Sequence, residues 1–192
     1  NMIDGLNGLC ASLCLVCFTG IIYMINADTV PSLFPLILPV GAIMGFLMYN
    51  LGVLGNQRTV FLGDNGSNAL GFMCAWILVY FSSVENSNFA PVTALWFVAI
   101  PFFDAVSVMA SRAIKGIMPL RPGRDHLHHK LLDMGLSSNA IYVFLIFTSA
   151  LFAAFGYVFN HSFPESHYIS FYAFMILWLC YYFLTSYISK NV

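Results

Sequence analysis

Three polar segments carry residue types that bind phosphate groups, and each lies beside a long apolar stretch. The segment VFLGDNGSNALG places Asp64 among glycines, just before an apolar run. Glycines beside a helix N-terminus expose backbone N–H groups that bind anions. Asp64 would repel a phosphate unless a divalent cation bridged the two, as Mg²⁺ does with one or two carboxylates. The segment indicates either such a site or an ordinary turn, with Asp64 solvated and Ser67 or Asn68 capping the next helix.

A second segment, RPGRDHLHHK, combines histidines with cations. His126, His128 and His129 invite a zinc interpretation, but no cysteine is near and the neighbouring residues are basic. A basic, histidine-rich loop suits a diphosphate better than a bare cation, and Arg124 can grip phosphate oxygens with its planar fork. The alternative is a solvated basic loop that sets membrane topology or contacts anionic headgroups.

The third polar segment is NMIDGLNGL, with Asn1, Asp4 and Asn7. Apart from these segments, one carboxylate lies well inside an apolar stretch: Asp104, roughly two helical turns before Arg112. A carboxylate at that depth in a membrane is energetically costly. It therefore indicates either a functional site or a structural hydrogen bond to a neighbouring helix or to backbone freed by a proline.

The stretches that position these residues have the composition of membrane spans. Hydrophobic residues make up 60% of the 192 residues and charged residues only 8%, with a mean hydropathy of +0.83. Soluble domains contain about 25% charged residues, so this composition excludes a soluble domain, and it also excludes a disordered chain. We expect an all-α polytopic membrane protein with about six transmembrane helices, because that many apolar stretches can each cross about 30 Å of hydrocarbon. The expected spans within the single domain 1–192 are about 9–27, 31–51, 68–84, 89–111, 139–160 and 167–188.

The distribution of charge predicts how these spans are oriented. If the N-terminal loop lies inside, all seven basic residues fall on that same side of the membrane. The positive-inside rule assigns this side to the cytoplasm. The three polar segments lie there too, in loops 1–8, 52–67 and 112–138, whereas the outer connections are short. This arrangement is typical of an active site built from loops over a membrane scaffold.

Other interpretations explain less of the sequence. The five cysteines lie in apolar stretches and are odd in number, which argues against a disulfide framework. Cys10, Cys14 and Cys17 share a helical face, which is more typical of a helix contact than of a metal site. A transporter subunit needs polar residues along several spans, and Asp104 stands alone. A structural module that binds anionic lipid leaves GDNGS unexplained.

Together the motifs resemble those of the polyprenyl-phosphate N-acetylhexosamine-1-phosphate transferases, glycosyltransferase family 4. The resemblance covers nearly the whole chain and consists, in order, of N-x-x-D-G-x-(D/N)-G-L, F-x-G-D-x-G-S, P-x-x-D and H-x-H-H. The H-L-H-H form is similar to the bacterial branch that uses UDP-GlcNAc. The alternative is the phospho-MurNAc-pentapeptide transferase of peptidoglycan synthesis, which has three consecutive histidines.

The resemblance implies an activity and a location. Members of this branch transfer GlcNAc-1-phosphate from UDP-GlcNAc to undecaprenyl phosphate and release UMP. They act at the cytoplasmic face of the bacterial inner membrane and begin O-antigen, enterobacterial common antigen or teichoic acid synthesis. The implied partners are these two substrates and membrane lipid, with no nucleic acid, and the sequence leaves a homodimer open.

The resemblance also implies a role for each matched residue. Asn1 and Asp64 would lie next to Mg²⁺, or Mn²⁺ in its place, and Phe61 would stack on uracil. Leu6 and Asn7 would border that base, with Asp4 alongside the nucleotide. The residues that would hold the diphosphate or the sugar are Arg124, His126, His128 and His129. The expected catalytic residues are Asp4, Asp64 and the three histidines.

One motif of the family has no counterpart in this sequence. The paired-aspartate motif (DDxxD type) precedes the NMIDG segment in the family, and no two aspartates are adjacent in this chain. We therefore expect these 192 residues to be the C-terminal part of a longer enzyme and to be inactive alone.

Overall fold

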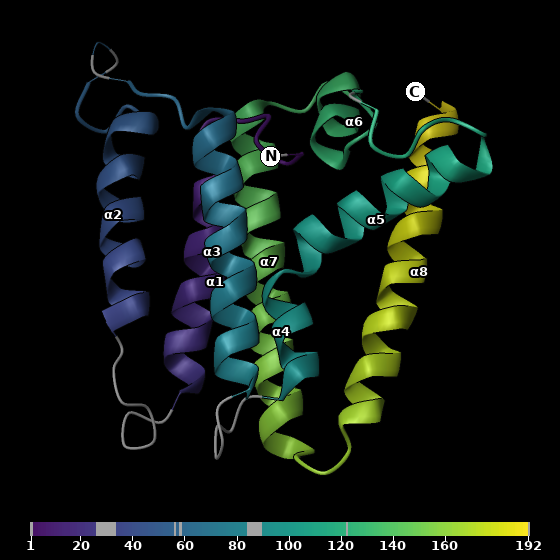
Figure 1. The fold of residues 1–192 in the computed structure, drawn as a ribbon. Coiled ribbons are helices and arrows are strands. Elements are labelled where there is room, and N and C mark those ends of the chain that lie inside the picture. Colours follow the sequence, from purple (N-terminus) through teal and green to yellow (C-terminus); the bar gives the residue numbers. More distant parts are fainter. Residues whose placement is uncertain are drawn as a thin grey trace.

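The computed structural model describes residues 2–25, 34–55, 57, 59–83, 90–121 and 123–191, which form eight α-helices and no strands (Figure 1). The helices are α1 (Leu9–Met24), α2 (Phe34–Asn50), α3 (Gly63–Ser83), α4 (Pro91–Phe97), α5 (Ala99–Ile114), α6 (Leu127–Asp133), α7 (Ser138–Ser162) and α8 (His167–Asn191). The all-α class predicted from the sequence is confirmed.

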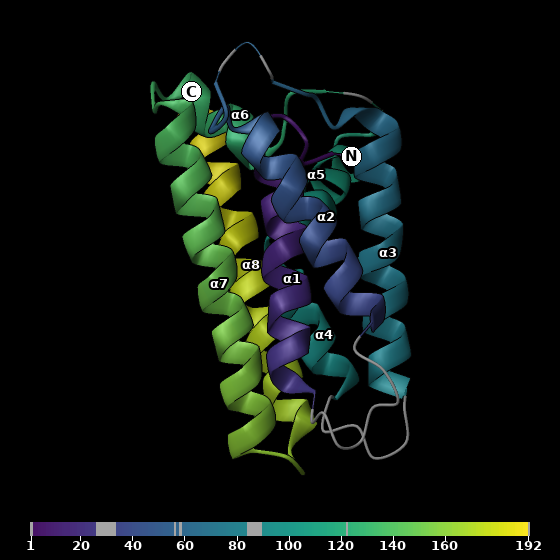
Figure 2. The same cartoon turned by 90° about the vertical axis from the view of Figure 1, so that its left-hand side faces the viewer.

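The long helices run alternately between the two ends of the molecule (Figures 1 and 2). The residues before α1, those leading into α3, the short helix α6 and the end of α8 gather at the upper end in Figure 1. The turn between α7 and α8 lies at the opposite end. The three polar segments therefore share one end, which is the arrangement that the alternation of spans predicts.

The helices differ in their capacity to cross a bilayer. Of the described helices, α7 and α8 are long and apolar enough, and α4 and α5 qualify together as a pair bent by 84°. Two apolar helices are shorter, with 16 residues in α1 and 17 in α2. The polar sequence GDNGSN occupies the first turns of α3. The described helices thus give two or three spans by length and composition, and the predicted six spans stay a prediction.

The structure corrects the predicted start of α3. The helix begins at Gly63, so Asp64 lies in its first turn and not in the preceding loop. Ser67, an expected cap, lies inside the helix, where its hydroxyl donates to the carbonyl of Asp64 at 3.2 Å. The first residues of α3 are polar, so no apolar periodicity marks its start. The start depends on Gly63, which has a φ of 66°, a left-handed conformation that glycine adopts readily. A carboxylate in the first turn also interacts favourably with the helix dipole.

The predicted span 89–111 consists of two helices, α4 and α5, separated by Val98. The sequence explains the break through Pro101, which has no N–H to donate to the carbonyl of residue 97 and whose ring crowds that carbonyl. The long loop 112–138 is also not wholly irregular, since it contains α6. Asp104 of α5 contacts the histidine segment at the start of α6.

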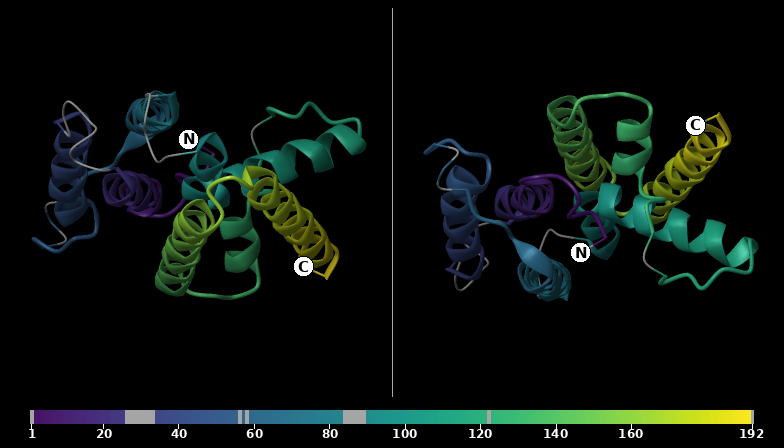
Figure 3. Two further views of the ribbon diagram at one scale, coloured as in Figure 1. Left: turned by 90° about the horizontal axis from the view of Figure 1, so that it is seen from below. Right: turned by 90° about the horizontal axis from the view of Figure 1, so that it is seen from above.

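The core is built around α1, which lies between α2, α3 and α7 in the views along the helix axes (Figure 3). One apolar cluster joins α1 to α2 and α3 through the fully buried side chains Phe18, Ile21, Leu36, Ile77 and Phe81. A second cluster joins α4, α5 and α8 through Trp96, Phe103 and Phe174. Large apolar side chains are exposed on α2, α7 and α8, among them Ile37, Met44, Phe147, Ile176 and Phe183. Such faces suit contact with lipid and not with water.

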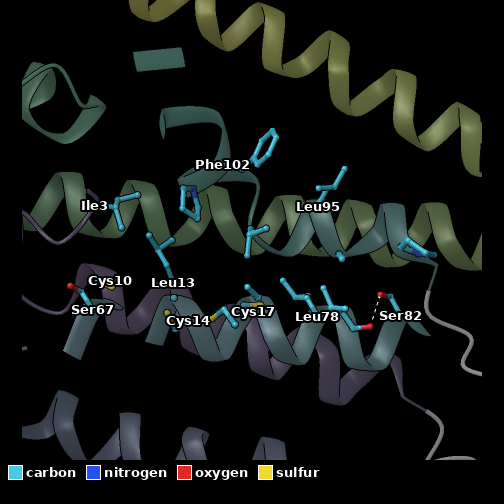
Figure 4. A pocket seen from close by; sticks show the side chains of 18 residues that line it. Ile3, Cys10, Leu13, Cys14, Cys17, Ser67, Leu78, Ser82, Leu95 and Phe102 are labelled. Atoms are coloured by element: carbon cyan, nitrogen blue, oxygen red, sulfur yellow. Dashed lines mark hydrogen bonds between the residues drawn. The ribbon is translucent and has the colours of Figure 1, made fainter. Parts of the chain in front are cut away.

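An apolar cavity of about 540 Å³ lies between α1, α3, α4 and α5 (Figure 4). The cysteines that share one face of α1 line this cavity together with Cys74 of α3. All five cysteines are free thiols. The described part of the chain contains no group of three or more His, Cys, Asp or Glu side chains arranged to hold a metal ion. The same cysteines belong to the buried apolar cluster that joins α1 to α2 and α3, which fits a helix contact.

Candidate active site

Two of the polar segments line one cavity of about 280 Å³ at the loop end of the molecule. Its walls are residues 4–8 before α1, residues 61–64 at the start of α3, and Phe46 and Asn50 of α2. The predicted nucleotide and metal residues that line it are Asp4, Leu6, Asn7, Phe61 and Asp64. Asn1, the second predicted metal residue, lies outside the described residues. We refer to this space as the Asp4–Asp64 cavity.

Local backbone features hold the walls of this cavity together. The Nδ2 atom of Asn50 donates to the carbonyl of Val60 at 2.7 Å, which fixes the segment before α3 against the end of α2. Gly8 turns the first segment into α1 with a φ of 74°, and a Cβ there would lie 2.6 Å from a methyl carbon of Leu51. Phe61 is 81% exposed, so its ring faces are accessible to a planar ligand.

The two carboxylates of the cavity supply negative charge that a bound cation would neutralise. Burial raises the pKa of the Asp4 carboxyl, and the negative charge of Asp64 raises it further. Both residues line the same cavity, so a cation between them would stabilise both charged forms. Two carboxylates are enough protein ligand for Mg²⁺, which completes its shell with water and phosphate oxygens. The residues present therefore fit a magnesium ion.

Asp104 anchors the histidine segment. One carboxylate oxygen, Oδ2, lies 2.7 Å from Nδ1 of His126. The other, Oδ1, accepts hydrogen bonds of 2.9 Å from the backbone N–H of Leu127 and from the hydroxyl of Tyr181. A carboxylate only accepts hydrogen bonds, so Nδ1 of His126 carries the proton. Through these hydrogen bonds Asp104 ties α5 to α8 and to the start of α6, and it holds His126 in place.

The next histidine, His128, is buried without a partner. Only 2% of its surface is exposed, and neither ring nitrogen has a hydrogen-bond partner among the described residues. Burial lowers the pKa of His128 to about 4, so the ring is neutral at pH 7. Nδ1 of His129, whose ring centroid lies 4.2 Å away, is also buried and unpaired. Unpaired buried nitrogens are costly, which is typical of a site that a ligand or water completes.

The ring of His128 lies directly against Gly5. A Cβ atom at position 5 would overlap Nε2 of His128. Gly5 is itself part of the wall of the Asp4–Asp64 cavity, so this contact joins the histidine segment to that wall. The histidines do not line the cavity, but this contact joins their segment to the first polar segment, which shares the cavity with residues 61–64.

Replacing Gly5 with alanine is expected to displace His128 and to destabilise the protein by about 1–3 kcal/mol, because the added methyl overpacks a buried ring. The matched control is Gly41→Ala in α2, where nothing lies within 4 Å of the added Cβ. Thermal unfolding of both variants in detergent would compare them. Equal unfolding midpoints for the two variants would contradict the contact.

The arginine predicted to grip the diphosphate lies elsewhere. Arg124 is exposed and pairs with Asp133 at 3.3 Å, outside the Asp4–Asp64 cavity. The buried arginine of this end is Arg112, whose guanidinium pairs with Asp125 at 2.7 Å and donates to two backbone carbonyls of residues 119–121. The sequence indicates for Arg112 only a role in membrane topology. Its position at the end of an apolar stretch, just before the long loop, is the sequence feature that could have indicated its burial.

Comparison with known proteins shows which family this chain resembles. The family model described as glycosyl transferase family 4 matches residues 1–82, which include the lining of the Asp4–Asp64 cavity. The undecaprenyl-phosphate alpha-N-acetylglucosaminyl 1-phosphate transferase of Escherichia coli strain K12 is 35% identical over 100% of this chain and 51% of its own length. The chain belongs to glycosyl transferase family 4.

Relatives of the same name from other bacteria are similarly related. The enzyme of the same name from Salmonella typhi is 34% identical over 100% of this chain and 51% of its own. The one from Yersinia pestis is 35% identical over 82% of this chain and 44% of its own. The chain thus spans about half the length of the curated relatives it matches. No solved structure matches it significantly.

Proposed function

We propose that the full-length protein containing this chain transfers GlcNAc-1-phosphate from UDP-GlcNAc to undecaprenyl phosphate and releases UMP. The convergence of Phe61, Asp4 and Asp64 on one cavity, with the unpaired His128 against its wall, supports this assignment. An aromatic ring, a pair of carboxylates and the neutral imidazole of His128 are complementary to a base, a cation-bound diphosphate and a sugar. The names of the relatives state the same acceptor and the same transferred group.

The reaction proposed for this site is a phosphoryl transfer. An oxygen of the lipid phosphate attacks the β-phosphorus of the nucleotide sugar, and the bond from that phosphorus to the bridging oxygen breaks. The bridging oxygen leaves with UMP. Enzymes accelerate such transfers mainly by positioning and by stabilising the developing negative charge. In this chain Phe61 would position the base, and the histidine segment would donate hydrogen bonds to the diphosphate or the sugar.

Mg²⁺ is the proposed cofactor, with Mn²⁺ as the alternative. Asp64 would hold the ion and Asp4 would lie beside it, because both carboxylates line the cavity and the charge of one raises the pKa of the other. Asn1 is the further ligand that the sequence suggests. The bound ion would neutralise the charge of the diphosphate.

The proposed location is the bacterial inner membrane, with the cavity on the cytoplasmic side. Five of the seven basic residues lie in residues 112–130, at the end of the molecule that carries the cavity (Figure 1). The positive-inside rule assigns that end to the cytoplasm. At the interface, a lipid phosphate and a soluble nucleotide sugar can reach one site together.

A direct assay tests the function. Membranes that contain the full-length protein, from a strain without its own enzyme, are supplied with undecaprenyl phosphate and UDP-GlcNAc. We expect UMP to be released in equal amount to a lipid-linked product. UDP-MurNAc-pentapeptide serves as the comparison donor. Turnover with that donor, and none with UDP-GlcNAc, would assign the chain to the peptidoglycan branch.

Replacing Phe61 with alanine is expected to weaken binding of UDP to the full-length protein. Stacking of a base on an aromatic ring contributes about 1–3 kcal/mol, which corresponds to roughly 5- to 150-fold in affinity. The matched control is Phe72→Ala, which removes a similarly exposed ring from α3 outside the cavity. Calorimetric titration with UDP measures both. Unchanged affinity in Phe61→Ala would exclude the stacking role.

A further inference from the structure

A second cleft, of about 610 Å³, lies between α5 and α8. The two helices diverge in the views along the helix axes, and the open side between them faces away from α1, α2 and α3 (Figure 3). Lys130 of α6 closes one side of the cleft. No residue lines both this cleft and the Asp4–Asp64 cavity, so the two spaces are separate.

The lining of the cleft carries more positive than negative charge. Among its lining residues, Arg112 is paired with Asp125, and Asp104 is occupied by His126, Leu127 and Tyr181. The ammonium group of Lys130 donates to the backbone carbonyl of Thr185 at 3.3 Å, and Lys115 is exposed. Together with Arg112, these lysines give the lining three positive charges against two carboxylates. Burial lowers the pKa of Lys130, and the positive charge of Lys115 lowers it further, while the two aspartates oppose the effect. An anion in the cleft would stabilise both ammonium groups.

Hydroxyl groups supply hydrogen-bond donors to the same space. Ser107 of α5 is 4% exposed, lines the cleft, and its Oγ has no hydrogen-bond partner in the described part of the chain. Ser111 and Ser186 line the cleft from opposite helices. A buried hydroxyl without a partner costs free energy, so Ser107 is typical of a site completed by a ligand.

The rim of the cleft is apolar. Ile114 and Phe183 line it and are 76% and 68% exposed, and Ile117 adds further apolar surface. A soluble anion gains nothing from such a rim. A lipid with an anionic headgroup has both required parts, because its phosphate meets the lysines and its acyl chains cover the apolar side chains.

From the charge, the unpaired hydroxyl and the apolar rim, we infer that the α5–α8 cleft binds the headgroup of an anionic phospholipid. The phosphodiester lies between Lys115 and Lys130 with Ser107 as a donor, and the acyl chains leave between α5 and α8. This lipid is not a reactant, and the inference stands independently of the transfer reaction.

Lipid retention by the full-length protein tests this site. The purified protein is mixed with phosphatidylglycerol or phosphatidylcholine, and retained lipid is measured by native mass spectrometry without nucleotide. We expect selective retention of phosphatidylglycerol. Lys115→Gln and Lys130→Gln should each weaken it about fivefold, the effect of roughly one basic residue near an anionic lipid phosphate. Lys115 is exposed, so its variant is expected to fold even if Lys130→Gln does not.

Arg121→Gln is the matched control, since it removes one exposed positive charge at the same end without altering the cleft lining. It should retain phosphatidylglycerol as the unaltered protein does. An equal loss in Arg121→Gln would reduce the effect to diffuse surface charge and overturn the inference.

Equal retention of phosphatidylcholine would also overturn the inference. Displacement of phosphatidylglycerol by an equal amount of undecaprenyl phosphate would assign the cleft to the acceptor lipid instead. Because the readout is lipid retention, failure here leaves the transferase proposal untouched.

Discussion

Asp64→Asn in the full-length protein should lower the rate of GlcNAc-1-phosphate transfer by about 10²- to 10³-fold, the loss typical of removing one electrostatic stabiliser of a transition state. Asparagine keeps the shape of the side chain but removes the charge that would hold Mg²⁺ against the diphosphate. UMP release at increasing Mg²⁺ concentrations measures the effect. We expect the variant to need far more Mg²⁺ and to remain slow at saturation.

Glu165→Gln is the matched control for the loss of one carboxylate. Glu165 is exposed in the turn between α7 and α8, at the end of the molecule opposite the Asp4–Asp64 cavity. This variant should transfer at the normal rate with normal dependence on Mg²⁺. If Asp64→Asn behaves in the same way, the metal assignment is wrong.

Asp104→Asn should lower the rate of transfer about 10- to 100-fold, the range seen when the group that orients a functional histidine is removed. The asparagine amide presents donors where His126 and Leu127 also donate, so at least one of the hydrogen bonds made by Asp104 is lost. The ring of His126 then loses its fixed orientation. Steady-state kinetics should show the loss mainly in kcat, because Asp104 does not line the Asp4–Asp64 cavity.

Tyr181→Phe gives a graded comparison. It removes only one of the three hydrogen bonds to Asp104 and leaves the contacts of His126 and Leu127 in place. We expect a loss of a few fold at most, together with a slightly lower unfolding midpoint from the lost hydrogen bond. If Tyr181→Phe were as slow as Asp104→Asn, loss of helix packing would explain both and the orienting role would be excluded.

Much of the architecture follows from local signals in the sequence. The apolar stretches predict the helices, and the alternation of these stretches predicts that NMIDGLNGL, GDNGS and HLHH share one end. These features depend on hydrophobicity and chain direction alone. The start of α3 was misplaced by five residues because glycine conformation, and not apolar periodicity, begins that helix. The break at Val98 was also missed, although Pro101 was visible, because a proline within an apolar run predicts a kink without its angle.

The partners of the site residues could not be predicted, because they depend on contacts between distant segments. His126 meets Asp104 only because the chain after α5 folds back over it. The burial of Arg112 and the exposure of Arg124 are set by the same loop, which reverses the roles that side-chain chemistry suggests. The unpaired state of His128 likewise results from where α6 lies, and no spacing in the sequence records it.

The close contact between Gly5 and His128 also limits which substitutions this chain can accept. Two positions more than a hundred residues apart occupy one small volume, so any side chain gained at position 5 demands a smaller or displaced group at position 128. Substitutions at the two positions are therefore expected to depend on each other. A relative with a smaller residue at position 128 could carry a side chain at position 5, and a relative that keeps histidine there is expected to keep glycine at position 5.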